Sequence, residues 1–409
     1  MTRTGYKMTE IGEMPEEWEV LAFEEAFNKQ ESKQSKIPAS KFKNKGKFPI
    51  IDQGMDLISG YTDNDELLYN GNLPLIIFGD HTLCVKYVDF QFAVGADGTK
   101  LLIPNNQRFS PRFLFFTILG KNLKSEGYKR HFSKLRKQFF QCPGINEQQK
   151  IAEILSTADE TIQKVNEEIT LTENLKKGLM QTLLTKGIGH TKFMITELGE
   201  IPEEWEVVNL NSLTYDFKNG FSSGRRSSEG VVQVRMNNIS TDGRLLLDSY
   251  IRVPAPKNLT EYTLENGDFL FNNTNSIDLV GKSAVFNGAQ FLCTFSNHFT
   301  RFRFYPDKIL PEIMLLQFIT LWETGIFKSL ATRYVGQASI PTDLLLHMAV
   351  KVPPMQEQIE IREMSRTLNQ KLNLLYYRKD KLENLKKGLM QSLLTGKLRV
   401  KMNTSKGED

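Results

Sequence analysis

The stretch that decides the fold is "ENLKKGLMQTLLT" at Glu173–Thr185, because the chain contains it twice. It returns as "ENLKKGLMQSLLT" at Glu383–Thr395, with twelve of thirteen positions identical. A match of this length inside one chain indicates a duplication, and an internal repeat sets the architecture before any local assignment is made. The two copies therefore define the ends of two related units.

A second pair of matching stretches opens each unit. "TEIGEMPEEWEV" (Thr9–Val20) and "TELGEIPEEWEV" (Thr196–Val207) agree at ten of twelve positions and contain Trp18 and Trp205. The opening stretches lie 187 residues apart and the closing stretches 210 apart, so the second unit is 23 residues longer. Each unit has a fixed start, a variable middle and a fixed end.

The closing stretches belong to long helices, because apolar residues recur there every three or four positions. In each copy nine of ten such positions are apolar, and no proline interrupts the series: Ile151, Ile154, Ala158, Ile162, Val165, Ile169, Thr172, Leu175, Leu179 and Leu183, then Ile361, Met364, Leu368, Leu372, Leu375, Lys379, Leu382, Leu385, Leu389 and Leu393. This spacing lies between the periods of a straight helix and a coiled coil. It predicts two helices of about 60 Å that pair with each other in antiparallel fashion.

A glycine lies at the same place in both predicted helices. Gly178 and Gly388 should each cost about 1 kcal/mol relative to alanine. We therefore expect something to approach the backbone there. Either the opposite helix of the pair or a helix of a partner protein fits this expectation.

The variable middles contain short β-branched and aromatic runs bounded by Gly, Asn, Asp and Pro, as strands do. They are "FPIID", "LPLIIFGD" and "KLLIP" in the first unit, and "VVQVRMNNI", "KSAVFNG" and "HFTRFRFYP" in the second. Helices are predicted late in each unit, in "SPRFLFFTILGKNL" and "LPEIMLLQFITLWETGIFKSL", which Pro111 and Pro311 open. The expected fold class is α+β, with two globular domains separated by two long antiparallel coiled-coil helices in a pseudo-two-fold arrangement.

The repeats also give domain boundaries. Globular domains are expected at residues 1–142 and 187–352, spacer helices at 143–186 and 353–396, and a C-terminal tail at 397–409. This division suits 409 residues, which is a length typical of two to three domains.

Composition excludes several classes of protein. The chain is 40% hydrophobic and 24% charged, as globular proteins are. No apolar run is long enough to span a membrane, and "MTRTGYKMTE" lacks the apolar core of a signal peptide. Three scattered cysteines form neither a disulfide framework nor a metal pattern. We expect a cytoplasmic protein.

Basic segments lie early in each unit, although the net charge is only +4. Residues 29–47 hold seven lysines and one acid, and "SSGRRSSEGVVQVRMNN" places three arginines among serines and asparagines. Such segments are either solvated loops or contacts to phosphate. The candidate DNA-binding residues are Lys41, Lys43, Lys45, Lys100 and Lys134 in the first unit, and Arg225, Arg226, Arg235, Asn237, Asn238, Asn272, Asn273, Asn275, Arg301, Arg333 and Gln337 in the second.

No catalytic, cofactor-binding or metal-binding group is predicted. The five histidines are scattered, and neither a phosphate-binding lysine loop nor a glycine-rich nucleotide loop of the kind that a methyltransferase needs is present. "DQG", "FGDHT" and "GADGTK" are signals for turns.

The motifs together resemble the specificity subunit of type I restriction-modification systems. The resemblance rests on the duplicated "G-x-[IM]-P-E-E-W-E-V", on "P-P-x-x-E-Q-x-x-I" from Pro353 to Ile361 before a long helix, and on "LLTGKLRV" near the C-terminus. It covers essentially the whole chain. The first copy departs at Gly144, which replaces the second proline of the "PP" pair.

The resemblance implies that each variable middle is a target recognition domain for one half of a split sequence in double-stranded DNA. The helices would set the spacing and dock two methyltransferase (modification) subunits, which would use S-adenosylmethionine to methylate adenine. Restriction motor-nuclease subunits would add cleavage driven by ATP with Mg, and this chain would do no chemistry. The alternatives are a DNA methyltransferase or nuclease with its own catalytic site, and a purely structural coiled-coil protein.

Overall fold

The computed structural model describes residues 3–29, 34–127 and 129–400, so residues 30–33 of the lysine-rich run lie outside the described residues. The chain forms two compact units. Unit 1 comprises residues 1–167 and 376–409, and unit 2 comprises residues 168–375. The boundary falls within each long helix, so each unit contains a part of both.

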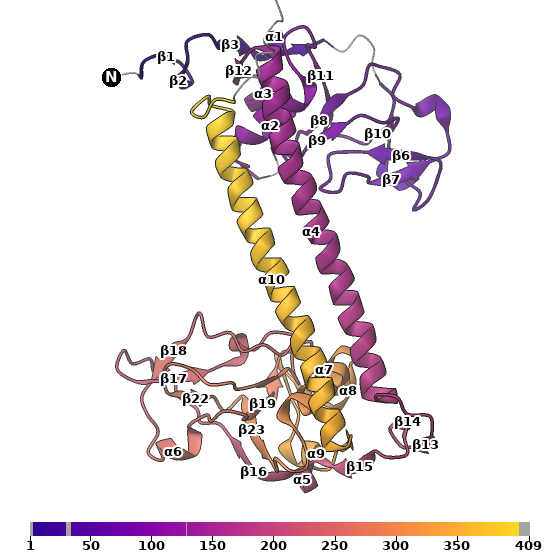
Figure 1. Ribbon diagram of the computed structural model, residues 1–409, viewed down its shortest axis with the longest axis vertical. Helices are drawn as coiled ribbons and strands as arrows, with labels where there is room; N and C mark the ends of the chain where they lie inside the picture. The colour runs from indigo at the N-terminus through magenta and orange to yellow at the C-terminus, as the bar shows by residue number, and fades with distance from the viewer. Residues whose placement is uncertain (1–2, 30–33, 128, 401–409) are drawn as a thin grey trace, which may run out of the picture. The chain divides into compact units, whose positions relative to one another are not determined.

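Unit 1 is an α+β structure built on two four-stranded sheets (Figure 1). One sheet has the order β4-β11-β8-β9 and is antiparallel, and the other has the order β5-β10-β6-β7 with β10 parallel to both β5 and β6. The elements are β1 (Tyr6–Thr9), β2 (Gly12–Pro15), β3 (Glu19–Ala22), α1 (Phe23–Ala26), β4 (Phe27–Asn28), β5 (Lys36–Ile37), β6 (Phe48–Ile51), β7 (Gly60–Thr62), β8 (Leu75–Gly79), β9 (Val85–Val88), β10 (Ala93–Gly95), β11 (Thr99–Pro104), α2 (Pro111–Gly120), α3 (Phe132–Leu135), β12 (Phe139–Cys142) and the first part of α4 (Ile145–Lys186).

Unit 2 repeats this plan with a larger β-structure. Its main sheet, β16-β23-β19-β21, is antiparallel, and the smaller sheets are β18-β17-β22 and β20-β25-β24. The elements are β13 (Phe193–Thr196), β14 (Gly199–Pro202), β15 (Glu206–Asn209), α5 (Leu210–Leu213), β16 (Thr214–Asn219), β17 (Val231–Val234), β18 (Ile251–Val253), α6 (Leu259–Tyr262), β19 (Phe269–Asn272), β20 (Thr274–Asn275), β21 (Ser283–Val285), β22 (Cys293–Phe295), β23 (Phe299–Phe304), α7 (Pro311–Glu323), α8 (Ile326–Leu330), β24 (Thr332–Tyr334), β25 (Gln337–Ser339), α9 (Thr342–Leu346), β26 (Ala349–Val352) and the first part of α10 (Met355–Leu393).

The predicted local structure is confirmed with two differences. The run "VVQVRMNNI" is a strand only as far as Val234, and Met236–Asn238 form a 3-10 turn because the Asn238 side chain bonds back to the Arg235 backbone. The late helix of unit 2 is divided at Gly325, whose φ of 79° lies in the left-handed region. Glycine adopts this conformation without the strain of a Cβ.

The two long helices are confirmed. Helix α4 runs for 42 residues and α10 for 39 residues. They are antiparallel in each unit: Asp159 near the start of α4 pairs with Lys386 near the end of α10 in unit 1, and Glu168 pairs with Lys371 at 3.2 Å in unit 2. The predicted α+β fold with two long packed helices is therefore correct.

The predicted apolar face of these helices is wrong at one repeated position. Leu175 and Leu385 are 60% and 56% exposed. In unit 2 the buried side chains after Thr172 are Met180, Leu183 and Leu184. The buried face moves around each helix because the end of α4 packs on the globular core of unit 2 and the end of α10 packs on that of unit 1. In addition, an ideal helix drifts about 20° per heptad from a strict coiled-coil seam.

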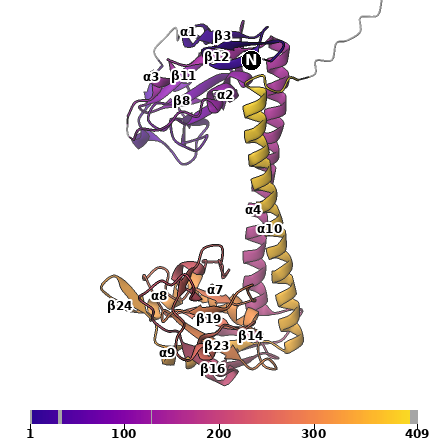
Figure 2. The same cartoon turned by 90° about the vertical axis from the view of Figure 1, so that its left-hand side faces the viewer.

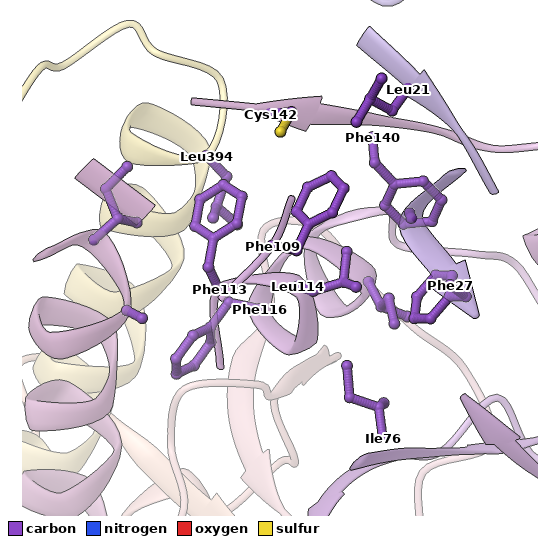
Figure 3. Close-up of a cluster of buried hydrophobic side chains, with 14 of the residues drawn as sticks. Leu21, Phe27, Ile76, Phe109, Phe113, Leu114, Phe116, Phe140, Cys142 and Leu394 are labelled. Carbon is purple, nitrogen blue, oxygen red and sulfur yellow. The ribbon is translucent and has the colours of Figure 1, made fainter. Parts of the chain in front are cut away.

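Figure 3 shows this packing in unit 1. Leu394, at the end of α10, is buried beside Phe113 and Phe116 of α2. The cluster continues to Phe140 of β12 and Phe27 of β4, which lie edge to face with ring centroids 5.6 Å apart. Burial of such aromatic side chains contributes roughly 1.5–3 kcal/mol each, so the helix end is part of the domain core.

The duplicated motifs meet in space and form what we call the clasp of each unit. In unit 1 the indole N–H of Trp18 donates to Glu147 at 3.0 Å, and in unit 2 that of Trp205 donates to Glu357 at 2.8 Å. Both tryptophans are buried. The opening "PEEW" motif is thus tied to the first turn of the long helix in each unit.

The glutamine that follows each clasp glutamate fixes the loop before the late helix. Gln148 accepts from the backbone N–H of Ser110 and donates to the backbone oxygens of Arg108 and Pro143, all at 2.8 Å. Gln358 makes the corresponding bonds in unit 2. The "E-Q" pair of the sequence motif is therefore a structural device that joins three segments of each unit.

Candidate nucleic-acid interface

Three turns of unit 1 that are distant in the sequence converge at the ends of its central strands. They are "DQG" (Asp52–Gly54), "FGDHT" (Phe78–Thr82) and "GADGTK" (Gly95–Lys100). The side chain of Gln53 joins them: its amide nitrogen donates to the Asp97 carbonyl oxygen at 2.8 Å, and its amide oxygen accepts from the His81 backbone N–H at 3.1 Å. We call this set of three turns the turn cluster.

Glycines permit this approach. A Cβ on Gly98 would lie 2.5 Å from the amide of Gln53, and φ of Gly98 is +85°. A Cβ on Gly79 would lie 2.1 Å from the hydroxyl of Thr82. Since real Cβ atoms do not approach other atoms so closely, the turn cluster needs glycine at both positions.

The lysine-rich segment adjoins the turn cluster. Phe42 fits against Gly95, where a Cβ would lie 3.0 Å from its ring. Lys41 and Lys45 on either side are exposed, and Lys43 pairs with Asp63 at 2.7 Å. Packing of Phe42 thus holds the segment that carries these exposed lysines beside Asp52 and Gln53.

A cavity of about 830 Å³ is lined by residues of β11 and by Asp97 of the turn cluster. Its wall combines cations with aromatic rings, among them Lys36, Lys100, Arg136, Phe27 and Phe132. Burial lowers the pKa of Lys36, and the nearby charge of Lys100 lowers it further. Lys100 lies 3.7 Å from Asp80 and over the ring of Phe132.

The five candidate lysines do not form one cluster. Lys100 lines the cavity, and Lys134 is held by Glu126 at 2.7 Å two residues after Phe132. Lys41, Lys43 and Lys45 belong to the segment beside the turn cluster.

In unit 2 the corresponding polar groups gather where β17 and β22 end, and we call them the polar rim. Arg235 donates through its guanidinium to Gln233 at 3.3 Å and to the Ser223 backbone oxygen at 3.2 Å. The loop that it holds carries Arg225 and Arg226, both exposed. Asn237 is exposed, whereas Asn238 is buried and donates to two backbone oxygens.

The three asparagines that follow β19 are buried and bonded within the protein. Asn272 donates to the backbone oxygens of Thr274 and His298, Asn273 donates to Thr300, and Asn275 donates to Asn272. Their burial favours a structural role in fixing the ends of the strands. The prediction that these asparagines contact DNA is untested, and their burial argues against it.

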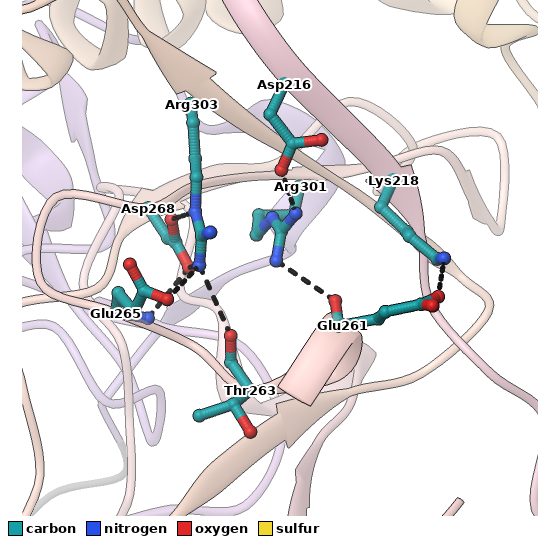
Figure 4. A network of polar contacts seen from close by, with 8 residues as sticks. All are labelled: Asp216, Lys218, Glu261, Thr263, Glu265, Asp268, Arg301 and Arg303. Atoms are coloured by element: carbon teal, nitrogen blue, oxygen red, sulfur yellow. Dashed lines mark hydrogen bonds and ion pairs between the residues drawn. The ribbon is translucent and has the colours of Figure 1, made fainter. Parts of the chain in front are cut away.

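Arg301 is also buried and bonded within the protein, inside a network of charges (Figure 4). Its side chain is 3% exposed, pairs with Asp216 and donates to the backbone oxygen of Glu261 at 3.1 Å. The neighbouring Arg303 binds Asp268 at 2.7 Å, which raises the pKa of the guanidinium. These arginines hold β16, β23 and the α6 segment together.

Arg333 and Gln337 are exposed on the hairpin β24–β25. Tyr334 between them is 63% exposed, and Val335 at the turn is fully exposed. The predicted site residues did not include Tyr334 or Val335. The signal was present, because an aromatic and a β-branched residue directly precede a turn glycine.

His298 was also absent from the predicted site residues. It follows β22 beside the polar rim, and no described residue gives its buried Nδ1 a hydrogen bond. Burial lowers its pKa, and the charge of Arg235 lowers it further. The imidazole is therefore neutral at pH 7 and presents a polar atom near the exposed Asn297.

The site is suited to polar contact with a ligand. Among residues 3–29, 34–127 and 129–400, no group of three or more His, Cys, Asp or Glu side chains could hold a metal ion. Within the same ranges no helix is long and apolar enough to cross a membrane. Arginine forks, amides and exposed lysines are the groups that proteins use on phosphates and base edges.

Comparison with known proteins agrees with this chemistry. Residues 15–173 match the model of the type I restriction modification DNA specificity domain. A type I restriction enzyme MjaVIII specificity subunit from Methanocaldococcus jannaschii is 26% identical, over 95% of this chain and 94% of that protein.

Two solved structures share the fold over nearly the full length. The type I restriction-modification S subunit from M. genitalium superposes with a TM-score of 0.60 at 16% identity, covering 98% of this chain and 100% of the other. A chain from a study of the complex assembly and conformational transition of the type I restriction-modification system gives 0.53 at 15% identity, covering 94% and 99%. Residues 15–173 thus match a type I restriction modification DNA specificity domain, and nearly the whole chain is similar to a specificity subunit of a type I restriction enzyme.

Proposed function

We propose that this chain binds two copies of one methyltransferase subunit and directs them to a bipartite DNA target. The observation that carries the proposal is the repeated, exposed face of the two closing helices. Each copy presents the same six exposed residues: Glu173, Asn174, Leu175, Lys177, Gly178 and Gln181 in α4, and Glu383, Asn384, Leu385, Lys387, Gly388 and Gln391 in α10.

Packing within the chain does not account for this identity. Exposed helix positions tolerate most substitutions, and the variable middles of the units share little sequence. A leucine that is more than half exposed in both copies stabilises neither unit by burial. The same external partner, bound twice, gives a physical reason for keeping both faces alike.

The repeated glycine supports a close approach by that partner. In the described part of the chain nothing lies within 4 Å of a Cβ built on Gly178 or Gly388. The expectation that the opposite helix approaches the glycine is therefore wrong, because the buried face has turned away from it. A helix of a partner protein remains, and a bare backbone allows such a helix to pack closely.

The partners follow from the family. We infer that the docked subunits hold S-adenosylmethionine and methylate adenine, and that motor-nuclease subunits using ATP and Mg join the same complex. We propose the cytoplasm as the location of this complex and double-stranded DNA as its target. We retain as proposals the division into recognition domains at 1–142 and 187–352, spacer helices at 143–186 and 353–396 and a tail at 397–409.

DNA reading is assigned to the turn cluster with its lysine segment in unit 1 and to the polar rim in unit 2. Each places exposed cations beside glycine and asparagine turns. Lysines there supply attraction to phosphate that depends on salt, and arginine and amide side chains supply contacts to base edges.

Docking is tested by native mass spectrometry of the chain co-expressed with its methyltransferase subunit. We expect two methyltransferase copies per chain, one after either Leu175→Asp or Leu385→Asp, and none after both. The matched control is Leu171→Lys, because Leu171 is 69% exposed and its counterpart in the other copy is already Lys381. Two copies retained in the double variant would contradict the assigned docking face.

DNA reading is tested by sequencing of methylated sites with the same complex. A bipartite target and no methylation by the chain alone are expected. Insertion of four residues after Glu168 lengthens the helix by about 6 Å. This should widen the unspecified spacer by about one or two base pairs and leave both half-sites unchanged. Altered half-site letters would show that reading and spacing are not separate.

A further inference from the structure

The hairpin β24–β25 of unit 2 ends in an apolar tip that the protein itself does not use. Val335 is 104% exposed and Tyr334 is 63% exposed. Exposed apolar surface of this kind is unfavourable in water and stabilises the protein only when a ligand covers it. Arg333 precedes the tip and is also exposed.

Turn chemistry does not explain Val335. Tyr334 pairs with Gln337, so Val335 and Gly336 form a two-residue loop. The loops that suit a hairpin place Gly, Asn or Asp first, because that residue needs a positive φ. Here only the second residue, Gly336, has a positive φ, of 78°. A β-branched residue at this position serves neither the turn nor the core.

The base of the hairpin is rigid. Strand β25 pairs with β20, Ala338 is fully buried, and the backbone N–H of Ile340 donates to the Asn273 oxygen at 2.9 Å. A tip held in one conformation loses little conformational entropy when it binds. The exposed residues are therefore presented by a fixed support.

The base of the hairpin adjoins the His298 segment beside the polar rim, because the backbone N–H of Asn273 donates to the His298 oxygen at 3.0 Å. Figure 2 shows β24 at the periphery of unit 2. Strand β20 begins two residues after Asn272, whose amide donates to the His298 oxygen. Two cations lie close by, since Lys328 and then Arg333 lower the pKa of Asp278. The apolar tip is thus carried by a hairpin whose base adjoins groups suited to phosphate and base edges.

We propose that this tip is a wedge, which enters between stacked base pairs of the half-site that unit 2 reads. The inference rests on the proposed function. Tyr334 stacks on an exposed base, Val335 fills the opened step, and Arg333 pairs with a flanking phosphate. Proteins that bend DNA insert apolar side chains in this way and gain additional contact surface from the bend.

The wedge adds a selectivity that needs no hydrogen bond to a base. Pyrimidine–purine steps unstack most easily, so the half-site of unit 2 should contain such a step at the point of entry. The flanking contacts of the polar rim then fix which step is opened.

The test uses the complete complex with its methyltransferase subunits and duplexes that it selects from a randomised library. 2-Aminopurine is placed at successive positions of the selected target, and its fluorescence reports unstacking. We expect a rise at one step of the unit 2 half-site, which Val335→Ser and Tyr334→Ala abolish. Because stacking on one base contributes roughly 1–3 kcal/mol, Tyr334→Ala should weaken binding about tenfold to a hundredfold.

Tyr215→Ala is the matched control. Tyr215 is 55% exposed but lies near the start of β16, whereas the strand reaches the rim side at Asn219. It should leave binding and fluorescence unchanged. Specific binding without a fluorescence change at any step overturns the wedge and leaves DNA recognition intact. If no sequence is selected at all, the proposed function fails together with it.

Discussion

The clasps of the two units share a tryptophan and a glutamate but are completed differently. In unit 1, Arg399 binds Glu147 through two nitrogens, at 2.8 and 3.0 Å, and also pairs with Glu17. In unit 2 the glutamate accepts from the backbone N–H of Ile188 at 2.7 Å and bonds to His190 at 3.0 Å. One clasp contains a permanent ion pair, and the other consists mainly of hydrogen bonds.

The completing segments also differ in their place in the chain. Residues after α4 complete the clasp of unit 2, and residues after α10 complete that of unit 1. Gly396 lies against Pro15 and Trp18, and its carbonyl accepts from Tyr6 at 2.8 Å. The C-terminal segment therefore does for unit 1 what the linker does for unit 2, so a duplicated chain closes both units with equivalent but unlike parts.

The largest expected effect comes from removing each glutamate. Glu147→Ala and Glu357→Ala leave a buried indole N–H without an acceptor, and the first also leaves Arg399 without its buried partner. Each should destabilise its own unit by about 2–4 kcal/mol. Hydrogen exchange of peptides from each unit measures this. Equal loss of protection in both units after either change would show that the clasps are not independent.

A milder substitution should separate the two clasps. Glu147→Gln keeps an acceptor for Trp18 but removes the charge that Arg399 binds, and we expect a loss of about 1–2 kcal/mol, because the pair is only partly screened by solvent. Glu357→Gln should cost less than about 1 kcal/mol, since His190 can still form a hydrogen bond with the amide. A larger loss in unit 2 would reverse the interpretation.

The helix glycines should behave alike in the two units. Gly178→Ala and Gly388→Ala each meet open space, so each should stabilise the isolated chain by up to about 1 kcal/mol through helix propensity. Thermal unfolding of the chain without partners measures the gain. Replacement of either glycine by leucine should retain most of the gain in stability but reduce methyltransferase docking. Unchanged docking would show that the glycine is not needed for close packing of a partner helix.

The smallest effect is a pH dependence of the clasp of unit 1. A backbone hydrogen bond, followed by the hydrogen bond from Arg399, lowers the pKa of Glu17. Stability from this carboxylate is therefore present above its ordinary pKa of 4.5 and is lost as pH falls below that value. Glu17→Gln should flatten the loss of unit 1 protection near pH 4, whereas Glu204→Gln in unit 2 serves as the control.

The sequence alone was sufficient for the duplication, the long helices, the fold class and the resemblance to type I specificity subunits. Helical periodicity and repeated words are local properties of the chain, and both are visible in any segment long enough to show them. The same periodicity predicted that Leu175 and Leu385 are buried, which is wrong. Where a helix stops packing on the other helix and packs on a globular core, its buried positions no longer follow a single period.

Only the tertiary structure decided which polar residues are free to meet a ligand. Arg301 and Arg333 look equally suited to DNA in the sequence, yet one is buried in an ion network and the other is exposed on a hairpin. Gln53 gains its role from a bond to Asp97, 44 positions away, and Glu147 gains Arg399 from 252 positions away. Burial and pairing depend on contacts between distant segments, so residue type and spacing do not determine them.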